Sequence, residues 1–292
     1  MIETIAIAGV GLIGGSFGLA LRAAGFRGEL LGVSSPATIE GALARKAIDR
    51  GVTLEEAART ADVIYLAQPI FRILDTLTAL GPLVREETLI TDAGSTKRAI
   101  AARARECLPT GFFLGGHPMA GKEARGVEVA EADLFVGRPY LLTADDPRVR
   151  NARITAEFVQ LVQRTGALPR WLTAAEHDRL VAASSHAPQL VSTALAAALA
   201  ARSDAGEVAA VAGPGLHDMT RLALSSYEIW RDILETNSGE IDAALAEVED
   251  SIAGVRAALA SSTMRQRFDE AASFAARLRG TRRDDSSGRS ER

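Results

Sequence analysis

The chain has 292 residues, enough for two domains that each bury a core of their own. Apolar residues make up 47% of it, but no run approaches the ~20 consecutive apolar residues of a membrane span, so no membrane partner is expected. A formal net charge of −4 argues against a nucleic-acid partner, because phosphate binding requires a basic surface.

The N-terminus and the cysteine content indicate a cytoplasmic protein. The first residues, MIETIAIAGV, already form a strand pattern and lack the basic and apolar regions of a secretory signal. Cys107 is the only cysteine, so no intrachain disulfide can form, which is usual in a reducing compartment.

Up to about residue 172 the chain shows an α/β pattern. Short apolar runs rich in β-branched residues alternate with helical patterns, which predicts a doubly wound, mostly parallel sheet with helices on both faces. A helix from Arg148 to Thr165 is predicted to end at Gly166. The predicted strands are Thr4–Val10, Glu29–Val33, Asp62–Ala67, Thr88–Asp92, Phe112–Gly115, Tyr140–Thr143 and Ala167–Leu172.

Beyond Leu172 the pattern becomes helical. Thr173 and Glu176 form the signature of a capping box at the start of a helix. Helical spacing continues to Leu278 with an interruption at Gly213-Pro214-Gly215, and the polar stretch Gly280–Arg292 predicts a disordered tail. The sequence therefore predicts an α/β domain at 1–172, an all-helical domain at 173–279 and a tail at 280–292.

A glycine-rich loop follows the first strand and precedes a helix predicted at Ser16–Ala24. Gly9 permits a tight turn, Gly11 lets the backbone approach a pyrophosphate, and Gly14 lets helix and strand pack closely. The start of the helix offers free N–H groups to phosphates. The loop thus predicts a Rossmann-type domain that binds NAD or NADP through Gly9, Gly11, Leu12, Ile13 and Gly14.

The end of the second strand bears on the choice of cofactor. An acidic residue there normally binds the ribose 2′-hydroxyl of NAD, but this chain has Ser34-Ser35-Pro36. Ser34 and Ser35 can donate hydrogen bonds to a 2′-phosphate, and no carboxylate repels it. NADP is slightly favoured over NAD.

Two later segments carry candidate chemistry. The fourth strand leads into Asp92-Ala93-Gly94-Ser95-Thr96-Lys97, and the fifth leads into Gly115-Gly116-His117-Pro118-Met119. Ligands bind such sheets beyond the carboxyl ends of the strands, where His117 could act as the base that alcohol oxidation requires. Ser95 could orient a hydroxyl or the histidine, and it also suits the N-cap of a helix predicted at Thr96–Cys107.

Five sequence segments occur in the order found in the prephenate/arogenate dehydrogenase family. They are GVGLIGGS, DAGSTK, GGHPMAGKE, EHD…SSHAPQ and MTRLALSSYEIWRDI, and the chain resembles this family from about Ile5 to Arg277. The resemblance implies oxidative decarboxylation of a cyclohexadienol, with hydride transfer to the nicotinamide. It implies that His117 takes or polarises the hydroxyl proton, that Ser95 contacts the reacting hydroxyl and helps to orient the histidine, and that Arg221 binds a substrate carboxylate.

Further residues are candidates for the substrate pocket. A planar guanidinium such as Arg221 suits a dianionic substrate, although an ion pair with its neighbours is the alternative. The family has a pocket histidine at the place of His186, and Lys122 and Glu123 follow the His117 segment, where a solvated loop is the alternative. His177 is interpreted as an interdomain or capping residue, and no pair of histidines has the spacing of a metal site.

Three other protein classes share part of this outline. β-Hydroxyacid dehydrogenases use a catalytic lysine early in the helical part, and this chain has no lysine beyond Lys122. A pyrroline-carboxylate reductase would leave His117 and Arg221 unexplained. A non-catalytic nicotinamide sensor would retain the glycine loop but would not require Ser95 and His117.

The sequence leaves several points open. Gln189 is neutral and would not specially favour the ammonium of arogenate, which favours prephenate weakly. The helical half, with its small-residue run Ala194–Ala201, is expected to form a homodimer. Whether Arg221 serves its own or the partner's site, and whether tyrosine gives feedback inhibition, is undecided at this stage.

Overall fold

The computed structural model describes residues 1–108, 112–122 and 124–287. Contacts divide the chain into two compact units, Met1–Ser238 and Gly239–Arg292. The first unit contains the sheet and the candidate site.

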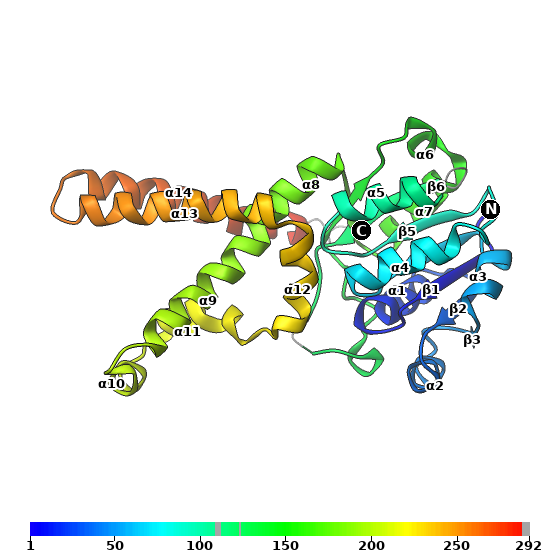
Figure 1. Cartoon of the computed structure of the whole chain (residues 1–292), viewed down its shortest axis with the longest axis horizontal. Coiled ribbons are helices and arrows are strands. Elements are labelled where there is room, and N and C mark those ends of the chain that lie inside the picture. The colour runs from blue at the N-terminus through cyan, green and yellow to red at the C-terminus, as the bar shows by residue number, and fades with distance from the viewer. Residues whose placement is uncertain (109–111, 123, 288–292) are drawn as a thin grey trace. The chain divides into compact units, whose positions relative to one another are not determined.

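The described strands form one eight-stranded sheet in the order β3-β2-β1-β4-β5-β6-β7-β8 (Figure 1). Neighbouring strands are parallel except β6 and β7, which are antiparallel. The strands are β1 Thr4–Ala8, β2 Glu29–Val33, β3 Arg50–Gly51, β4 Val63–Leu66, β5 Leu89–Asp92, β6 Phe112–Pro118, β7 Pro139–Thr143 and β8 Leu168–Leu172.

The connecting helices cover both faces of the sheet. The β1–α1–β2 crossover moves toward one edge and β4–α4–β5 toward the other, so right-handed crossovers place α1 and α4 on opposite faces. The strand order reverses between β1 and β4, where such sheets bind ligands. These helices are α1 Leu12–Ala23, α2 Pro36–Ala44, α3 Leu54–Thr60, α4 Ile70–Leu80, α5 Arg98–Cys107, the 3-10 turn η1 Val127–Val129, α6 Pro147–Asn151 and α7 Arg153–Arg164.

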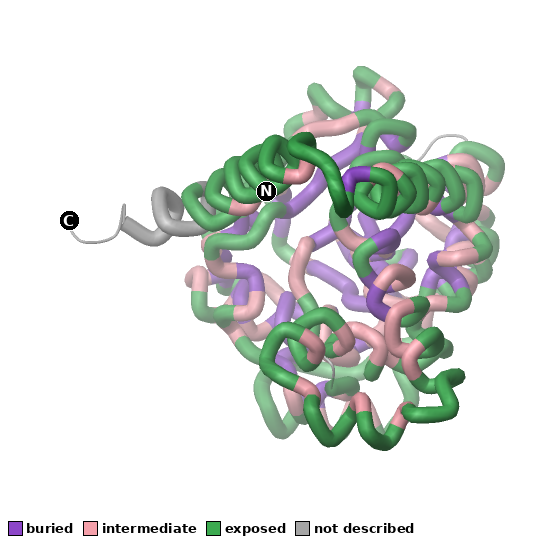
Figure 2. The backbone as a smooth tube through the Cα atoms, turned by 90° about the vertical axis from the view of Figure 1, so that its left-hand side faces the viewer, coloured by how far each residue is buried: buried purple, intermediate pink, exposed green. Residues whose placement is uncertain are grey.

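The core lies between the sheet and these helices. The central strands are largely buried, and all of β4 is buried. Figure 2 shows the buried segments of the chain in purple. Phe17 of α1 stacks on Tyr65 of β4 with ring centroids 4.1 Å apart, and Phe135 meets Phe17 edge-on at 6.3 Å. This packing fixes α1, and with it the glycine loop, against the central strands.

The helical segment of the first unit packs directly on the sheet domain. The predicted capping box is present, with Thr173 and Glu176 bonded reciprocally at the start of α8. α8 contacts α5 and β8, and α12 contacts α4, so these helices belong to the same compact unit as the sheet, which continues to Ser238. The elements are α8 Ala174–Val181, the π-helical turn η2 Ala182–His186, α9 Ala187–Ala200, α10 Ala205–Ala210, α11 Pro214–Thr220, the 3-10 turn η3 Arg221–Leu224 and α12 Tyr227–Thr236.

The second unit begins one residue into α13 Ser238–Ala258 and also contains α14 Thr263–Ser287. Helix α14 extends seven residues past Gly280, where a disordered tail was predicted to begin, because a polar segment can continue a helix that has already formed. The rest of the predicted tail, 288–292, lies outside the described residues. Within the described part of the chain, no helix is long and apolar enough to cross a membrane.

Several elements differ from their prediction. β3 was not predicted, because two residues, Arg50 and Gly51, carry no periodic pattern. β6 continues through Pro118 because it pairs with β7, so His117 is a strand residue and not a loop residue. The helix predicted at Arg148–Thr165 is divided at Ala152, which has an extended backbone.

Candidate active site

The glycine loop joins β1 to α1 at the carboxyl edge of the sheet. Gly9 has φ +90°, and a Cβ atom there would lie 2.7 Å from the Ala67 carbonyl oxygen. A Cβ atom on Gly14 would lie 2.2 Å from the Gly9 carbonyl oxygen, whereas one on Gly11 would meet no atom within 4 Å. Steric packing therefore requires glycine at the first and last positions, while the backbone at Gly11 is open to a ligand.

The start of α1 is free to bind an anion. Gly11 is its N-cap and offers no side-chain cap to the first turn. Leu12 and Ile13 begin the helix, where N–H groups have no partner within the helix and the helix dipole is positive. Together with the open backbone at Gly11, this geometry fits the pyrophosphate of a dinucleotide.

The two serines after β2 have different surroundings. Ser35 is the N-cap of α2, where its hydroxyl oxygen accepts a hydrogen bond from the Thr38 N–H at 3.4 Å and lies 2.9 Å from Thr38 Oγ1. Ser34 is exposed directly beyond the end of β2. Ser34 is therefore the freer donor of the pair.

Asp92, the last residue of β5, is fully buried and joins the two segments that carry candidate chemistry. Its Oδ2 accepts the Gly94 N–H at 2.8 Å and pairs with Lys97 Nζ, and its Oδ1 accepts the Gly116 N–H at 3.0 Å. These bonds hold the half-buried Ser95 segment against the end of β6. Burial lowers the pKa of Lys97, and the carboxylate of Asp92 opposes that effect.

The interpretation of Ser95 as a helix N-cap is wrong. Helix α5 begins at Arg98, and its N-cap residue Lys97 provides no side-chain cap. The carboxylate of Asp178, from α8, instead accepts the backbone N–H groups of Lys97 at 2.7 Å and Arg98 at 2.9 Å. The serine hydroxyl is not needed for helix capping because a distant acid has that role.

His117 lies near the end of β6, with 9% of its surface exposed. Its Nδ1 is 2.9 Å from Nε2 of His177, whose Nδ1 is 2.8 Å from Oδ1 of Asp178. His177 and Asp178 are fully buried. His177, predicted to be interdomain or capping, therefore contacts the candidate base directly.

Burial and hydrogen bonding set the charges in this cluster. Burial lowers the pKa of His117 well below its ordinary value, and electrostatic repulsion from His177 and Lys97, which would oppose a positive charge on the ring, lowers it further. Burial also lowers the pKa of His177, against the opposing effect of Asp178. Burial alone would raise the pKa of Asp178, but hydrogen bonds from His177, Arg98 and Lys97 lower it. At neutral pH the site holds two neutral histidines and a carboxylate.

His186 lies in the π-helical turn between α8 and α9 and is 1% exposed. Its Nδ1 is 3.3 Å from Nδ2 of Asn237, which also donates to the Asp178 carbonyl oxygen at 2.9 Å. Trp230 meets the His186 ring edge-on with centroids 5.9 Å apart. Burial lowers the pKa of His186 to about 4, so this side chain too is neutral at neutral pH.

Arg221 begins η3 and is exposed. The next residues attach this turn to α9, because Gln189 Nε2 donates to the Leu222 carbonyl oxygen at 2.7 Å and Ser192 Oγ accepts the Ala223 N–H at 3.2 Å. The guanidinium thus extends from a fixed backbone, and the Gln189 amide is bonded to that backbone.

Lys122 and Glu123 were predicted to face a ligand. Lys122 is exposed, forms an ion pair with Glu131 and donates to the Val129 carbonyl oxygen at 3.3 Å. Its contacts are those of a solvated loop. Glu123 lies outside the described residues.

Sequence reasoning did not assign Asp92, Lys97, Asp178 or Asn237 to the site. The one available signal was the adjacent pair His177-Asp178 in the first turn of a helix, directly after the last strand of the sheet. The contact of His177 with His117 joins positions 60 residues apart, which periodicity cannot reveal.

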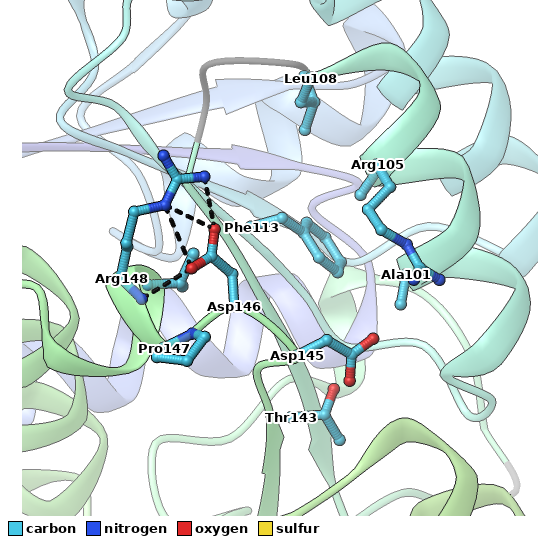
Figure 3. A pocket seen from close by; sticks show the side chains of 11 residues that line it. Ala101, Arg105, Leu108, Phe113, Thr143, Asp145, Asp146, Pro147 and Arg148 are labelled. Atoms are coloured by element: carbon cyan, nitrogen blue, oxygen red, sulfur yellow. Dashed lines mark hydrogen bonds and ion pairs between the residues drawn. The ribbon is translucent and has the colours of Figure 1, made fainter.

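A hollow of about 500 Å³ lies elsewhere in the first unit, between α5 and α6 (Figure 3). Arg105 near the end of α5 and Phe113 near the start of β6 line it, so it lies at the edge of the sheet opposite to His117. Asp146 and Arg148 on its wall pair with each other at 2.7 Å. Among all the described residues, no three histidine, cysteine or carboxylate side chains gather as a metal site.

Family models and a curated relative match most of the chain. The prephenate dehydrogenase nucleotide-binding domain matches residues 17–167, and the prephenate dehydrogenase dimerization domain matches residues 173–273. Prephenate dehydrogenase of Bacillus subtilis (strain 168) is 34% identical over 250 residues, which are 82% of this chain and 66% of that protein. The chain thus spans slightly less than two thirds of that relative's length.

Two crystal structures resemble the whole chain. Synechocystis arogenate dehydrogenase has a TM-score of 0.77 and 31% identity, and the match covers 96% of this chain and 99% of that one. Prephenate dehydrogenase from A. aeolicus, in complex with hydroxyphenyl propionate and NAD+, has a TM-score of 0.82 and 27% identity, covering 97% and 98%.

Proposed function

The chain belongs to the prephenate dehydrogenase family, and on that premise we propose that it catalyses the NAD(P)-dependent oxidative decarboxylation of prephenate to 4-hydroxyphenylpyruvate in tyrosine biosynthesis. The observation that carries this proposal is the buried His117 at the carboxyl edge of the sheet, the edge that also bears the glycine loop. A neutral imidazole in that place suits the removal of a hydroxyl proton.

The proposed reaction keeps its atoms and electrons in balance. The hydride on the hydroxyl-bearing ring carbon is accepted by the nicotinamide, which is the chemistry that the cofactor supplies when bound. His117 takes the hydroxyl proton as the ketone forms. The ring carboxylate then leaves as carbon dioxide, and its bonding electrons pass through the ring to the ketone oxygen. His117 returns the proton to that oxygen, which yields the phenol and a neutral base.

The remaining residues bind and orient. Ser95 follows a segment fixed by Asp92, and we assign it to the reacting hydroxyl. We assign the guanidinium of Arg221 to a substrate carboxylate, since a planar fork binds carboxylates through two hydrogen bonds and its backbone is fixed to α9. We also assign His186 to the substrate pocket. Lys122 and Glu123 remain weaker candidates.

The cofactor is assigned to the loop Gly9–Gly14 and to Ser34, with Ser35 as a second donor. The exposed Ser34 and the absence of a carboxylate at the end of β2 favour NADP slightly over NAD. The A. aeolicus relative, whose fold is similar, was crystallised with NAD+, so NAD is the alternative cofactor. A cytoplasmic location remains a prediction from the sequence.

Arogenate is the alternative substrate, and it would give tyrosine directly. The Synechocystis relative is an arogenate dehydrogenase. The Gln189 amide is neutral and bonded to the Leu222 carbonyl oxygen, so it offers no charge to the ammonium of arogenate. Prephenate is therefore the first candidate.

Steady-state kinetics over prephenate or arogenate with NAD or NADP test the proposal, with formation of the reduced nicotinamide as the readout. We expect turnover with prephenate, and we expect His117→Asn to lower kcat by about 10³-fold or more with little change in KM, because the base acts in the transition state. His217→Asn, at an exposed position on α11, is the matched control. Cofactor binding without turnover of either cyclohexadienol would instead indicate a nicotinamide sensor.

A further inference from the structure

A continuous hydrogen-bonded path leads from the candidate base into the protein. His117 Nδ1 contacts His177 Nε2 at 2.9 Å, and His177 Nδ1 contacts Asp178 Oδ1 at 2.8 Å. The path ends at the start of α5, where the two oxygens of Asp178 accept the backbone N–H groups of Lys97 and Arg98. All three side chains of the path are buried.

The direction of each hydrogen bond follows from the carboxylate. An ionised Asp178 can only accept, so Nδ1 of His177 carries a proton and donates it. In a neutral His177 the other nitrogen, Nε2, then has no proton and accepts. Nδ1 of His117 must therefore be the donor in its contact with His177. The second nitrogen of His117, Nε2, is left with a free lone pair.

We propose that His177 and Asp178 are positioning residues that hold His117 in the Nδ1–H tautomer and so present an unprotonated Nε2 to the substrate hydroxyl. The inference rests on the proposed function, because a fixed tautomer matters only if His117 acts as a base. When His117 takes the proton, its Nδ1–H already points along the path to the carboxylate, which stabilises the imidazolium.

The charges around His117 leave Asp178 as the group that stabilises its protonated form. His117 also faces Lys97 and His186, and both disfavour a positive charge on its ring. His177 faces Asp178 and Asp92 as anions and Lys97 as a cation. Since Lys97 is paired with Asp92, Asp178 is the carboxylate that the two histidines reach through hydrogen bonds.

The path also links parts of the chain that are remote in sequence. His117 comes from β6, and its positioning residues come from α8, where the helical segment begins. Asp178 caps α5 with the same carboxylate that fixes His177. The orientation of the base therefore depends on the docking of α8 against α5.

The test compares His177→Leu, which cannot accept a hydrogen bond, with His177→Gln, whose Oε1 can take the place of Nε2. Nitrogen-15 NMR of the full-length protein without substrate reports the tautomer of His117, whose signals are identified by their loss in His117→Asn. We expect Nδ1–H in the wild type and in His177→Gln, and Nε2–H in His177→Leu. We expect kcat to fall about 10²- to 10⁴-fold in His177→Leu with KM nearly unchanged, and to recover to within about tenfold of wild type in His177→Gln.

His217→Leu is the matched control and should retain both the tautomer and kcat. If His177→Leu does not fold, as judged by circular dichroism, His177→Asn replaces it, because its shorter side chain cannot reach His117. An Nε2–H tautomer in the wild type would overturn the inference, as would a folded His177→Leu with wild-type kcat. If wild-type His117 has the expected Nδ1–H tautomer but the protein turns over no cyclohexadienol, the proposed function is overturned. The hydrogen-bonded path from His117 to Asp178 is then still supported.

Discussion

At the scale of single residues, the site buries three histidines in their neutral form. His117, His177 and His186 all have pKa values lowered chiefly by burial. A neutral imidazole can accept a proton from a substrate, which a protonated one cannot. The same burial that suits a base at neutral pH makes the site sensitive to acid.

The effect of this burial on stability can be measured for His186. Its pKa is about 4 in the folded protein and about 6.5 in an unfolded chain. The unfolded state therefore binds the proton more readily, so the stabilising effect is complete above about pH 6.5 and is lost as the pH falls toward 4. Each unit of difference corresponds to about 1.4 kcal/mol.

We expect the free energy of unfolding to fall between pH 7 and pH 5, and to fall less steeply in His186→Gln. Urea unfolding at both pH values measures the two slopes, and His217→Gln on the exposed surface should behave as the wild type. Equal losses of stability in His186→Gln and wild type would show that protonation of His186 does not oppose folding.

At the scale of elements, two glycines of the loop between β1 and α1 have different roles: Gly14 is required for packing, and we assign Gly11 to ligand binding. Alanine at Gly14 would place a Cβ atom 2.2 Å from the Gly9 carbonyl oxygen, so α1 would have to move away from β1. Alanine at Gly11 would meet no protein atom within 4 Å.

We therefore predict that Gly14→Ala lowers the melting temperature, whereas Gly11→Ala leaves it unchanged and weakens dinucleotide binding by about tenfold or more. Thermal unfolding without ligand and calorimetric titration with NAD and NADP measure the two effects. A Gly11→Ala protein with wild-type affinity for both dinucleotides would remove Gly11 from the binding site.

Sequence patterns located most elements because each strand and helix carries its own periodicity. The strands of the central sheet, the glycine loop and the capping box at Thr173 depend on neighbouring residues and could be predicted. The extension of β6 through His117 depends on pairing with β7, and the capping of α5 depends on Asp178, some 80 residues away. Contacts of this kind leave no local signal.

At the scale of the whole molecule, the second unit buries little of its own apolar surface. The turn between its two helices leaves Leu259 73% exposed, and α14 leaves Phe268 70%, Phe274 56% and Leu278 56% exposed. Large apolar side chains gathered on one pair of helices are typical of a protein interface. The family model that covers 173–273 is a dimerization domain. We propose that these helices form part of a homodimer interface.

Replacing Phe268 and Phe274 together by serine should weaken dimerisation by about 10²-fold or more, because large buried aromatic side chains dominate such interfaces. Sedimentation equilibrium measures the dissociation constant, and Leu43→Ser on the exposed side of α2 is the control. If only folded chains dimerise, the melting temperature also rises with protein concentration. We expect this dependence in the wild type and in Leu43→Ser and its loss in the double variant. A double variant that dimerises with wild-type affinity would place the interface elsewhere.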